Sequence, residues 1–204
     1  MKKETNEDPF ATRCWYYDII IDPMQVLAAV YVHAELYYYL KMIRKVLQYA
    51  DAEKLFKKSS PCDVILYMKI ICSLIRVSHS LQEIKASPIS VSENDAFNKT
   101  YYRSHLVSSS DWKDFPRYLS IEEYCNPYRA LRKVFSYQNM DRWLYLWTEA
   151  VENALSEHSG GEEFERIRVF LLLNKLVEAT HLINVREVNH IGGRMKNRVV
   201  NVKM

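Results

Sequence analysis

The sequence predicts an all-α protein, a single helical bundle of five or six helices. All four glycines stand in the pairs Gly160-Gly161 and Gly192-Gly193, so residues 1–159 contain none. Sheet proteins that turn every few residues, and loops that cradle phosphates, rely on the positive φ angles that glycine tolerates. Several pairs of a capping residue followed by proline, which begin helices, point the same way. Helix is therefore the structure that this chain favours.

Length and composition fit one domain over residues 1–204, because 49% of the residues are hydrophobic and domains usually span about 100–200 residues. The net charge of +3 is unevenly placed. From Asn184 onward the basic residues outnumber the single acid, Glu187. These basic residues are Arg186, Arg194, Lys196, Arg198 and Lys203. The sequence therefore predicts a basic tail at 191–204 on a body that is close to neutral.

The chain shows no targeting signal, which predicts a cytoplasmic protein that does not enter a membrane. Residues Met1–Phe10 have no apolar segment of the signal-peptide type. The most apolar run, Val64–Val77, is shorter than the roughly 20 residues that span a bilayer. The four cysteines are widely spaced and form no C-x-x-C pair, so we expect reduced thiols and no cofactor.

The N-terminal half is expected to form a long helical hairpin over residues 22–86, after a leader at 1–21. Asp22-Pro23 combines an N-cap with proline at the first helical position, and predicts one helix as far as about residue 50. Ser60-Pro61 repeats this signal and predicts a second helix to about residue 85. The polar stretch 87–118 follows as an excursion, with a short helix possible over 95–106.

The C-terminal helices are expected between residues 119 and 190. Ser120-Ile121-Glu122-Glu123 has the pattern of a capping box, and Asn126-Pro127 begins a helix to about Tyr137. Another helix is predicted from Met140 or Asp141 to about Glu157. The last, from Glu162 to about Val188, is apolar nearly all round and should be central in the bundle.

Three polar residues on apolar helix faces suggest either a site or a structural network. Glu35 falls among tyrosines on the first helix, while Glu178 and His181 share one face of the last helix as a Glu-x-x-His pair. Helical metal bundles use such pairs with further glutamates, so Glu35, Glu178 and His181 are candidate metal ligands. The structural alternative is that Asn174, Glu178 and His181 form hydrogen bonds that fix how the last helix packs. Glu35 would then be satisfied by tyrosine hydroxyls or by a basic partner from another helix, or would reach water at the edge of its helix.

The chain has 15 tyrosines, more than a core can absorb. Tyr37, Tyr101 and Tyr102 are therefore candidates for partner contact, since tyrosine is frequent in interfaces. The tail residues Arg194, Lys196 and Arg198 could bind an acidic partner or nucleic acid. Trp143 and Trp147, four residues apart, are expected in the core.

No catalytic motif accompanies these residues. The G-x-S-x-G and H-E-x-x-H patterns are both missing from the sequence. The leading hypothesis is accordingly a non-enzymatic protein that binds a protein partner or itself, or acts as a scaffold, through its tyrosines and the excursion. The alternatives are a metal-binding bundle and nucleic-acid binding through the tail.

Overall fold

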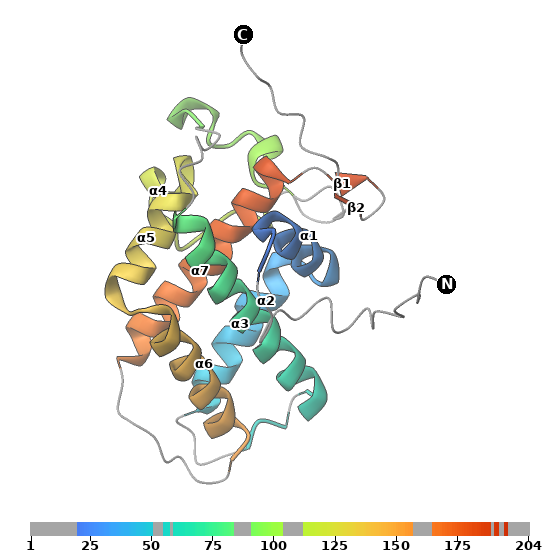
Figure 1. The fold of residues 1–204 in the computed structure, drawn as a ribbon, viewed down its shortest axis with the longest axis vertical. Coiled ribbons are helices and arrows are strands. Elements are labelled where there is room, and N and C mark those ends of the chain that lie inside the picture. The colour runs from blue at the N-terminus through green and yellow to red at the C-terminus, as the bar shows by residue number, and fades with distance from the viewer. Residues whose placement is uncertain are drawn as a thin grey trace.

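The computed structural model describes residues 20–50, 55–57, 59–83, 91–103, 112–156, 165–188, 190–191 and 194–195, and in this part of the chain the fold is helical (Figure 1). The all-α prediction is confirmed, but the count of five or six helices is wrong, because the described residues form seven. The α-helices are α1 (Pro23–His33), α2 (Leu36–Tyr49), α3 (Pro61–Glu83), α4 (Ile121–Cys125), α5 (Pro127–Tyr137), α6 (Met140–Ala154) and α7 (Arg166–Glu187).

The helix starts predicted at Pro23, Pro61, Ile121, Pro127 and Met140 are confirmed, whereas the last helix begins at Arg166 and not at the predicted Glu162. The Asp22 side chain accepts a hydrogen bond of 2.9 Å from the backbone N–H of Met24, and Pro23 is the first residue of α1. At α4, the Ser120 hydroxyl accepts from the Glu123 N–H while the Glu123 carboxylate accepts from the Ser120 N–H. Such reciprocal capping supplies partners for backbone donors that the first helical turn leaves open.

The single helix predicted for residues 22–50 is wrong, because the chain breaks at Ala34 and Glu35. Both residues have extended backbone, with ψ angles of 156° and 155°. The buried Tyr39 hydroxyl donates a 2.6 Å hydrogen bond to the Val30 carbonyl at the end of α1. No glycine or proline marks this break, so packing rather than local propensity places it. The predicted two-helix hairpin is consequently three helices.

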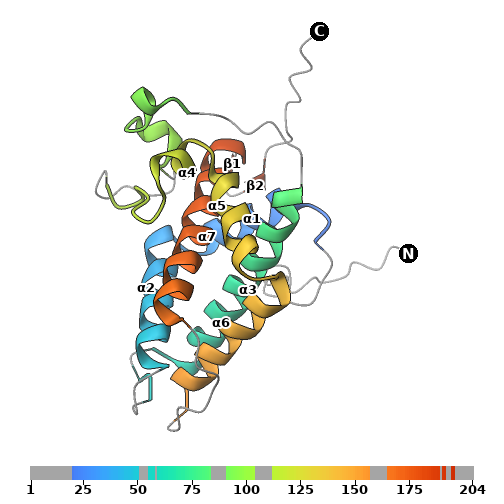
Figure 2. The same cartoon turned by 90° about the vertical axis from the view of Figure 1, so that its left-hand side faces the viewer.

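Helix α7 is central, as the sequence predicts. It contacts α1, α2, α3, α4 and α5, and Figure 2 shows it between α2 and α5. Trp143 and Trp147 of α6 are fully buried, and their indole N–H groups donate to the carbonyls of Val134 and Met68. The prediction that both tryptophans belong to the core is confirmed.

Helix α3 is longer than its most apolar run suggested. Residues Pro61–Gln82 are long and apolar enough to cross a membrane, and 56% of the window that meets this criterion is buried within the protein. A core helix of a helical bundle meets the same criterion, and α3 contacts α1, α5, α6 and α7. Length and composition alone are therefore weak support for a membrane span here.

The excursion contains a small core of its own. Its described part forms two 3₁₀ turns, Glu93–Asp95 and Lys99–Tyr101, where the sequence suggested a short helix over 95–106. These turns lie with α4 at the end of the molecule that also carries β1 and β2 (Figure 1). A second group of buried residues joins the excursion to α4 and α7. Its members are Val91, Ala96, Tyr102, Tyr124 and Leu182.

Near the C-terminus, β1 (His190–Ile191) pairs antiparallel with β2 (Arg194–Met195). Arg194, a predicted partner-binding residue, is the Cα partner of Ile191 in this pairing. Lys196 and Arg198 lie outside the described residues, as do residues 1–19 of the predicted leader.

Candidate functional site

Glu178 is fully buried at the middle of α7 and holds the end of the excursion. Its two carboxylate oxygens accept hydrogen bonds of 2.7 Å from the Arg117 N–H and 2.8 Å from the Tyr118 N–H. Burial raises the pKa of Glu178 to about 7, although these backbone donors act in the opposite direction. Glu178 therefore fixes residues 117 and 118 against the central helix.

His181, one turn further along α7, holds the other arm of the excursion. Its Nε2 lies 2.9 Å from the Tyr102 carbonyl oxygen, so Nε2 carries the proton and donates. Nδ1 is buried and has no hydrogen-bond partner among the described residues. Burial lowers the pKa of His181, while the nearby charge of Asp114 acts to raise it.

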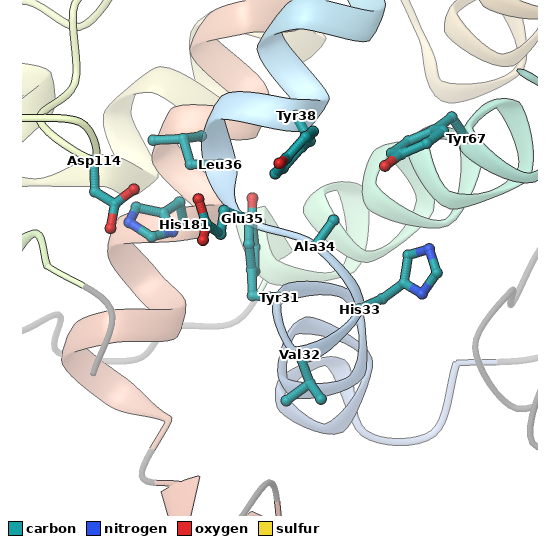
Figure 3. A pocket seen from close by; sticks show the side chains of 10 residues that line it. All are labelled: Tyr31, Val32, His33, Ala34, Glu35, Leu36, Tyr38, Tyr67, Asp114 and His181. Carbon is teal, nitrogen blue, oxygen red and sulfur yellow. The ribbon is translucent and has the colours of Figure 1, made fainter. Parts of the chain in front are cut away.

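Asp114 is the group beside this imidazole that the sequence analysis missed. It is 3% exposed, and its Oδ1 is buried without a hydrogen-bond partner among the described residues. Figure 3 shows its carboxylate next to the His181 ring. Two buried acceptor atoms, Nδ1 of His181 and Oδ1 of Asp114, are thus left without donors.

Glu35 is engaged elsewhere, in an ion pair of 2.5 Å with Lys113. A basic partner for Glu35 is one of the structural alternatives, but Lys113 belongs to the excursion and not to another helix. Glu35, Glu178 and His181 therefore each have a different partner. No group of three or more His, Cys, Asp or Glu side chains that could hold a metal occurs within the described ranges. The geometry gives no support to the metal site predicted from these three residues.

Two hollows flank residues 112–118. The first, here called the acidic cavity, has a volume of about 440 Å³ and contains both Glu35 and Asp114 (Figure 3). It lies at the break between α1 and α2, against α3 and α7. Its lining residues are Tyr31, Val32, His33, Ala34, Glu35, Leu36, Tyr38, Tyr67, Asp114 and His181.

The second hollow, here called the basic groove, has a volume of about 460 Å³. It lies between α2 and the same segment of the excursion, and it combines four cationic side chains with four aromatic ones. Its lining residues are Tyr37, Leu40, Lys41, Arg44, Trp112, Lys113, Phe115, Arg117 and Tyr118. No acidic residue lines it.

Cations and rings alternate in the basic groove. The ammonium groups of Lys41 and Lys113 lie 5.4 and 5.5 Å from the centroid of the Tyr37 ring. Within about 6 Å such contacts are attractive cation–π interactions. Trp112 is 54% exposed, which is unusual for so large an apolar side chain. The groove therefore offers positive charge and apolar surface together.

The three tyrosines predicted to contact a partner differ in their exposure to solvent. Tyr37 is 43% exposed and lines the basic groove. Tyr102 is fully buried, so its assignment to an exposed contact surface is wrong: its ring packs against Trp112 and Phe115 in the small core. Tyr101 is partly buried, and its carbonyl accepts a hydrogen bond from Arg186.

Arg186, counted with the basic tail in the sequence, has a structural role. Its guanidinium donates to the carbonyls of Tyr101 and Tyr124 at 2.9 and 2.7 Å, and lies over the Tyr124 ring. The Arg186 guanidinium therefore joins α7 to the excursion and to α4. The four cationic side chains of the basic groove come from α2 and residues 112–118 instead.

The described residues form a helical protein with two neighbouring hollows, one lined by two acidic residues and the other by four basic ones. No family model matches the chain, and no curated protein or solved structure is detectably similar to it.

The sequence could not reveal either hollow because each joins segments far apart in the chain. In residues 112–118, the aromatic residues Trp112 and Phe115 flank the charged residues Lys113 and Asp114. This pattern has no helical or strand period that would indicate which side chain faces inward. The hydrogen bonds to Glu178 and the contact of the Tyr118 ring with Phe170 place the segment against α7.

Proposed function

We propose that this chain is a non-enzymatic binding protein that recognises an acidic segment of a partner protein through the basic groove. The observation that carries the proposal is the lining itself, four cations and four aromatic side chains with no acid among them. Surfaces that bind acidic partners present complementary positive charge, and aromatic and arginine side chains supply much of the binding energy at interfaces.

The groove has cations that are available to a partner. Lys113 already forms an ion pair with Glu35, which shows that a carboxylate fits at this edge. Lys41 and Arg44 are both exposed, and neither forms an ion pair with a described residue. The Arg44 guanidinium donates only a long hydrogen bond, of 3.5 Å, to the Tyr118 hydroxyl. A carboxylate placed between Lys41 and Arg44 would be attracted to both.

A peptide fits the groove better than a nucleic acid does. Binding of single strands depends on open aromatic faces on which bases can stack. In the groove, two ammonium groups already lie over the Tyr37 ring. Carboxylates would pair with these lysines without displacing them. Nucleic-acid binding through the tail, self-association and a cytoplasmic location stay predictions from the sequence.

The test is the affinity for a fluorescein-labelled peptide of alternating Glu and Tyr, measured by anisotropy against the same peptide with Gln in place of Glu. We expect the acidic peptide to bind and the neutral one to bind at least tenfold more weakly. The double variant Lys41→Gln/Arg44→Gln should lose about tenfold in affinity, since rim charges contribute up to about 1 kcal/mol each. Arg132→Gln, an exposed change on α5, is the matched control.

Three results would contradict the proposal. One is binding of the neutral peptide as tight as that of the acidic one, and another is binding by the double variant as tight as that by Arg132→Gln. Tighter binding of a single-stranded oligonucleotide of the same charge would assign the groove to nucleic acid instead.

A further inference from the structure

The acidic cavity contains a pair of buried acceptors that the protein itself leaves unmet. Asp114 and His181 are 3% and 1% exposed, and both line the cavity. Neither Oδ1 of Asp114 nor Nδ1 of His181 has a hydrogen-bond partner among the described residues. Buried polar atoms are nearly always paired, so an unpaired set at a cavity indicates a partner from outside the chain.

The protonation state of His181 determines which hydrogen-bonding groups the ligand must have. Because the Tyr102 carbonyl can only accept, Nε2 of His181 must carry the hydrogen, and the neutral ring then presents a lone pair at Nδ1. Burial favours this neutral ring by lowering the pKa of His181. Oδ1 of the Asp114 carboxylate is also an acceptor. A ligand must therefore supply at least two hydrogen-bond donors.

The remaining walls favour a positive charge on the ligand. The lining includes two carboxylates, Glu35 and Asp114, and no lysine or arginine. Three tyrosine rings, Tyr31, Tyr38 and Tyr67, also line it, and aromatic faces attract organic cations.

The Tyr31 hydroxyl is not available as a donor, because it is already bonded to the Val177 carbonyl at 2.7 Å and to Thr180 at 2.8 Å. Lys113, which lines the basic groove, neutralises Glu35 through their ion pair, so Asp114 is the carboxylate of this lining that forms no ion pair with a described residue. The donors and the charge must therefore come from the ligand.

We infer that the acidic cavity binds a small organic cation with several N–H groups, a primary alkylammonium or alkylguanidinium, held between Asp114 and His181. Its N–H groups donate to Oδ1 and Nδ1 while its alkyl body lies against the tyrosine rings. A single bridging water would satisfy the same two atoms, but a water takes up only about 30 Å³ of a hollow of about 440 Å³. This inference concerns a different hollow from the basic groove, and it is tested with different probes and variants.

The test uses the full chain and titration calorimetry with n-butylammonium. Two probes of similar size separate the contributions: tetramethylammonium has the charge without N–H donors, and n-butanol has the alkyl body without the charge. We expect saturable binding of n-butylammonium at millimolar concentration or below, and at least tenfold weaker binding of both other probes.

Variants locate the site. Asp114→Asn keeps the shape but removes the charge, and its amide can donate to Nδ1 of His181, so n-butylammonium affinity should fall at least tenfold. Asp141→Asn, an exposed change on α6 away from the cavity lining, should bind like the unmodified protein. The inference is overturned if n-butylammonium gives no binding up to about 10 mM. It is equally overturned if tetramethylammonium binds as well as n-butylammonium, or if Asp114→Asn keeps full affinity.

Discussion

At the scale of single residues, polar side chains of α7 decide what surrounds the helix. Glu178 holds residues 117 and 118, His181 holds Tyr102, and Thr180 meets the Tyr31 hydroxyl of α1. Each of these side chains is buried, and each serves a different neighbour. Buried polar groups of this kind specify one arrangement, because any other would leave them without partners.

Glu178 should make stability depend on pH. Its native pKa of about 7 lies above the ordinary 4.5, so the native state binds more protons than the unfolded state between these values. The stabilisation by this proton is complete below about pH 4.5 and is lost as the pH rises through 7. Urea unfolding of the unmodified protein and Glu178→Gln at pH 5 and pH 8 tests this.

We expect the free energy of unfolding of the unmodified protein to fall, relative to the variant, by on the order of 3 kcal/mol between these pH values. His181, whose pKa is shifted downward, acts with the opposite sign but is present in both proteins and cancels. A difference between the two proteins that does not change with pH would show that Glu178 is not a buried titrating group.

Asp114→Asn should stabilise the ligand-free protein. The carboxylate has a buried oxygen without a donor, beside an imidazole nitrogen without a donor. An amide N–H at position 114 can donate to Nδ1, and one added buried hydrogen bond contributes about 1 kcal/mol. Thermal unfolding should therefore show a higher Tm for Asp114→Asn than for the control Asp141→Asn. A lower Tm would mean that the carboxylate has a structural partner.

At the scale of elements, the sequence predicts helix N-caps but not the break between α1 and α2. Asp22 and the Ser120–Glu123 box each act through neighbours within three residues, so the local pattern contained the whole interaction. At the Ala34–Glu35 break the contacts are distant in sequence: Glu35 pairs with Lys113, which lies 78 positions further along the chain, and the Tyr39 side chain is fully buried. Tertiary contacts override helix propensity at such positions.

The break should depend on the Tyr39 hydroxyl. This group is fully buried and donates to the Val30 carbonyl at 2.6 Å, near the end of α1. Tyr39→Phe should lower the free energy of unfolding by about 1 kcal/mol, because the change removes the donor of a buried hydrogen bond. Tyr37→Phe, in which the lost hydroxyl belongs to an exposed residue, is the control in urea unfolding. Equal losses in the two variants would show that the bond contributes nothing to the break.

At the scale of the whole molecule, α7 is the central helix and the excursion supplies residues to both hollows. The apolar circumference of α7 predicted its central place, and the stripe of Asn174, Glu178 and His181 indicated packing through polar contacts. Two members of that stripe hold the excursion, whereas Asn174 donates to the carbonyl of Phe170 on its own helix. The sequence did not show which segment would contact Glu178, since every residue except proline offers the same backbone N–H group.

One segment, residues 112–118, supplies side chains to both hollows. In the segment 112–118, Asp114 lines the acidic cavity, whereas Trp112, Lys113 and Phe115 line the basic groove. The Glu35–Lys113 ion pair joins a residue of one lining to a residue of the other. Both proposed binding sites therefore require that this segment be fixed in place on α7.

Amide hydrogen exchange at Arg117 and Tyr118, followed by NMR in the ligand-free protein, tests this requirement most directly. Both N–H groups donate to a fully buried carboxylate, so we predict exchange roughly a hundredfold or more slower than in an unstructured peptide. Exchange of the two amides at the rate of an unstructured peptide would contradict the account, because neither hollow would then have a fixed wall.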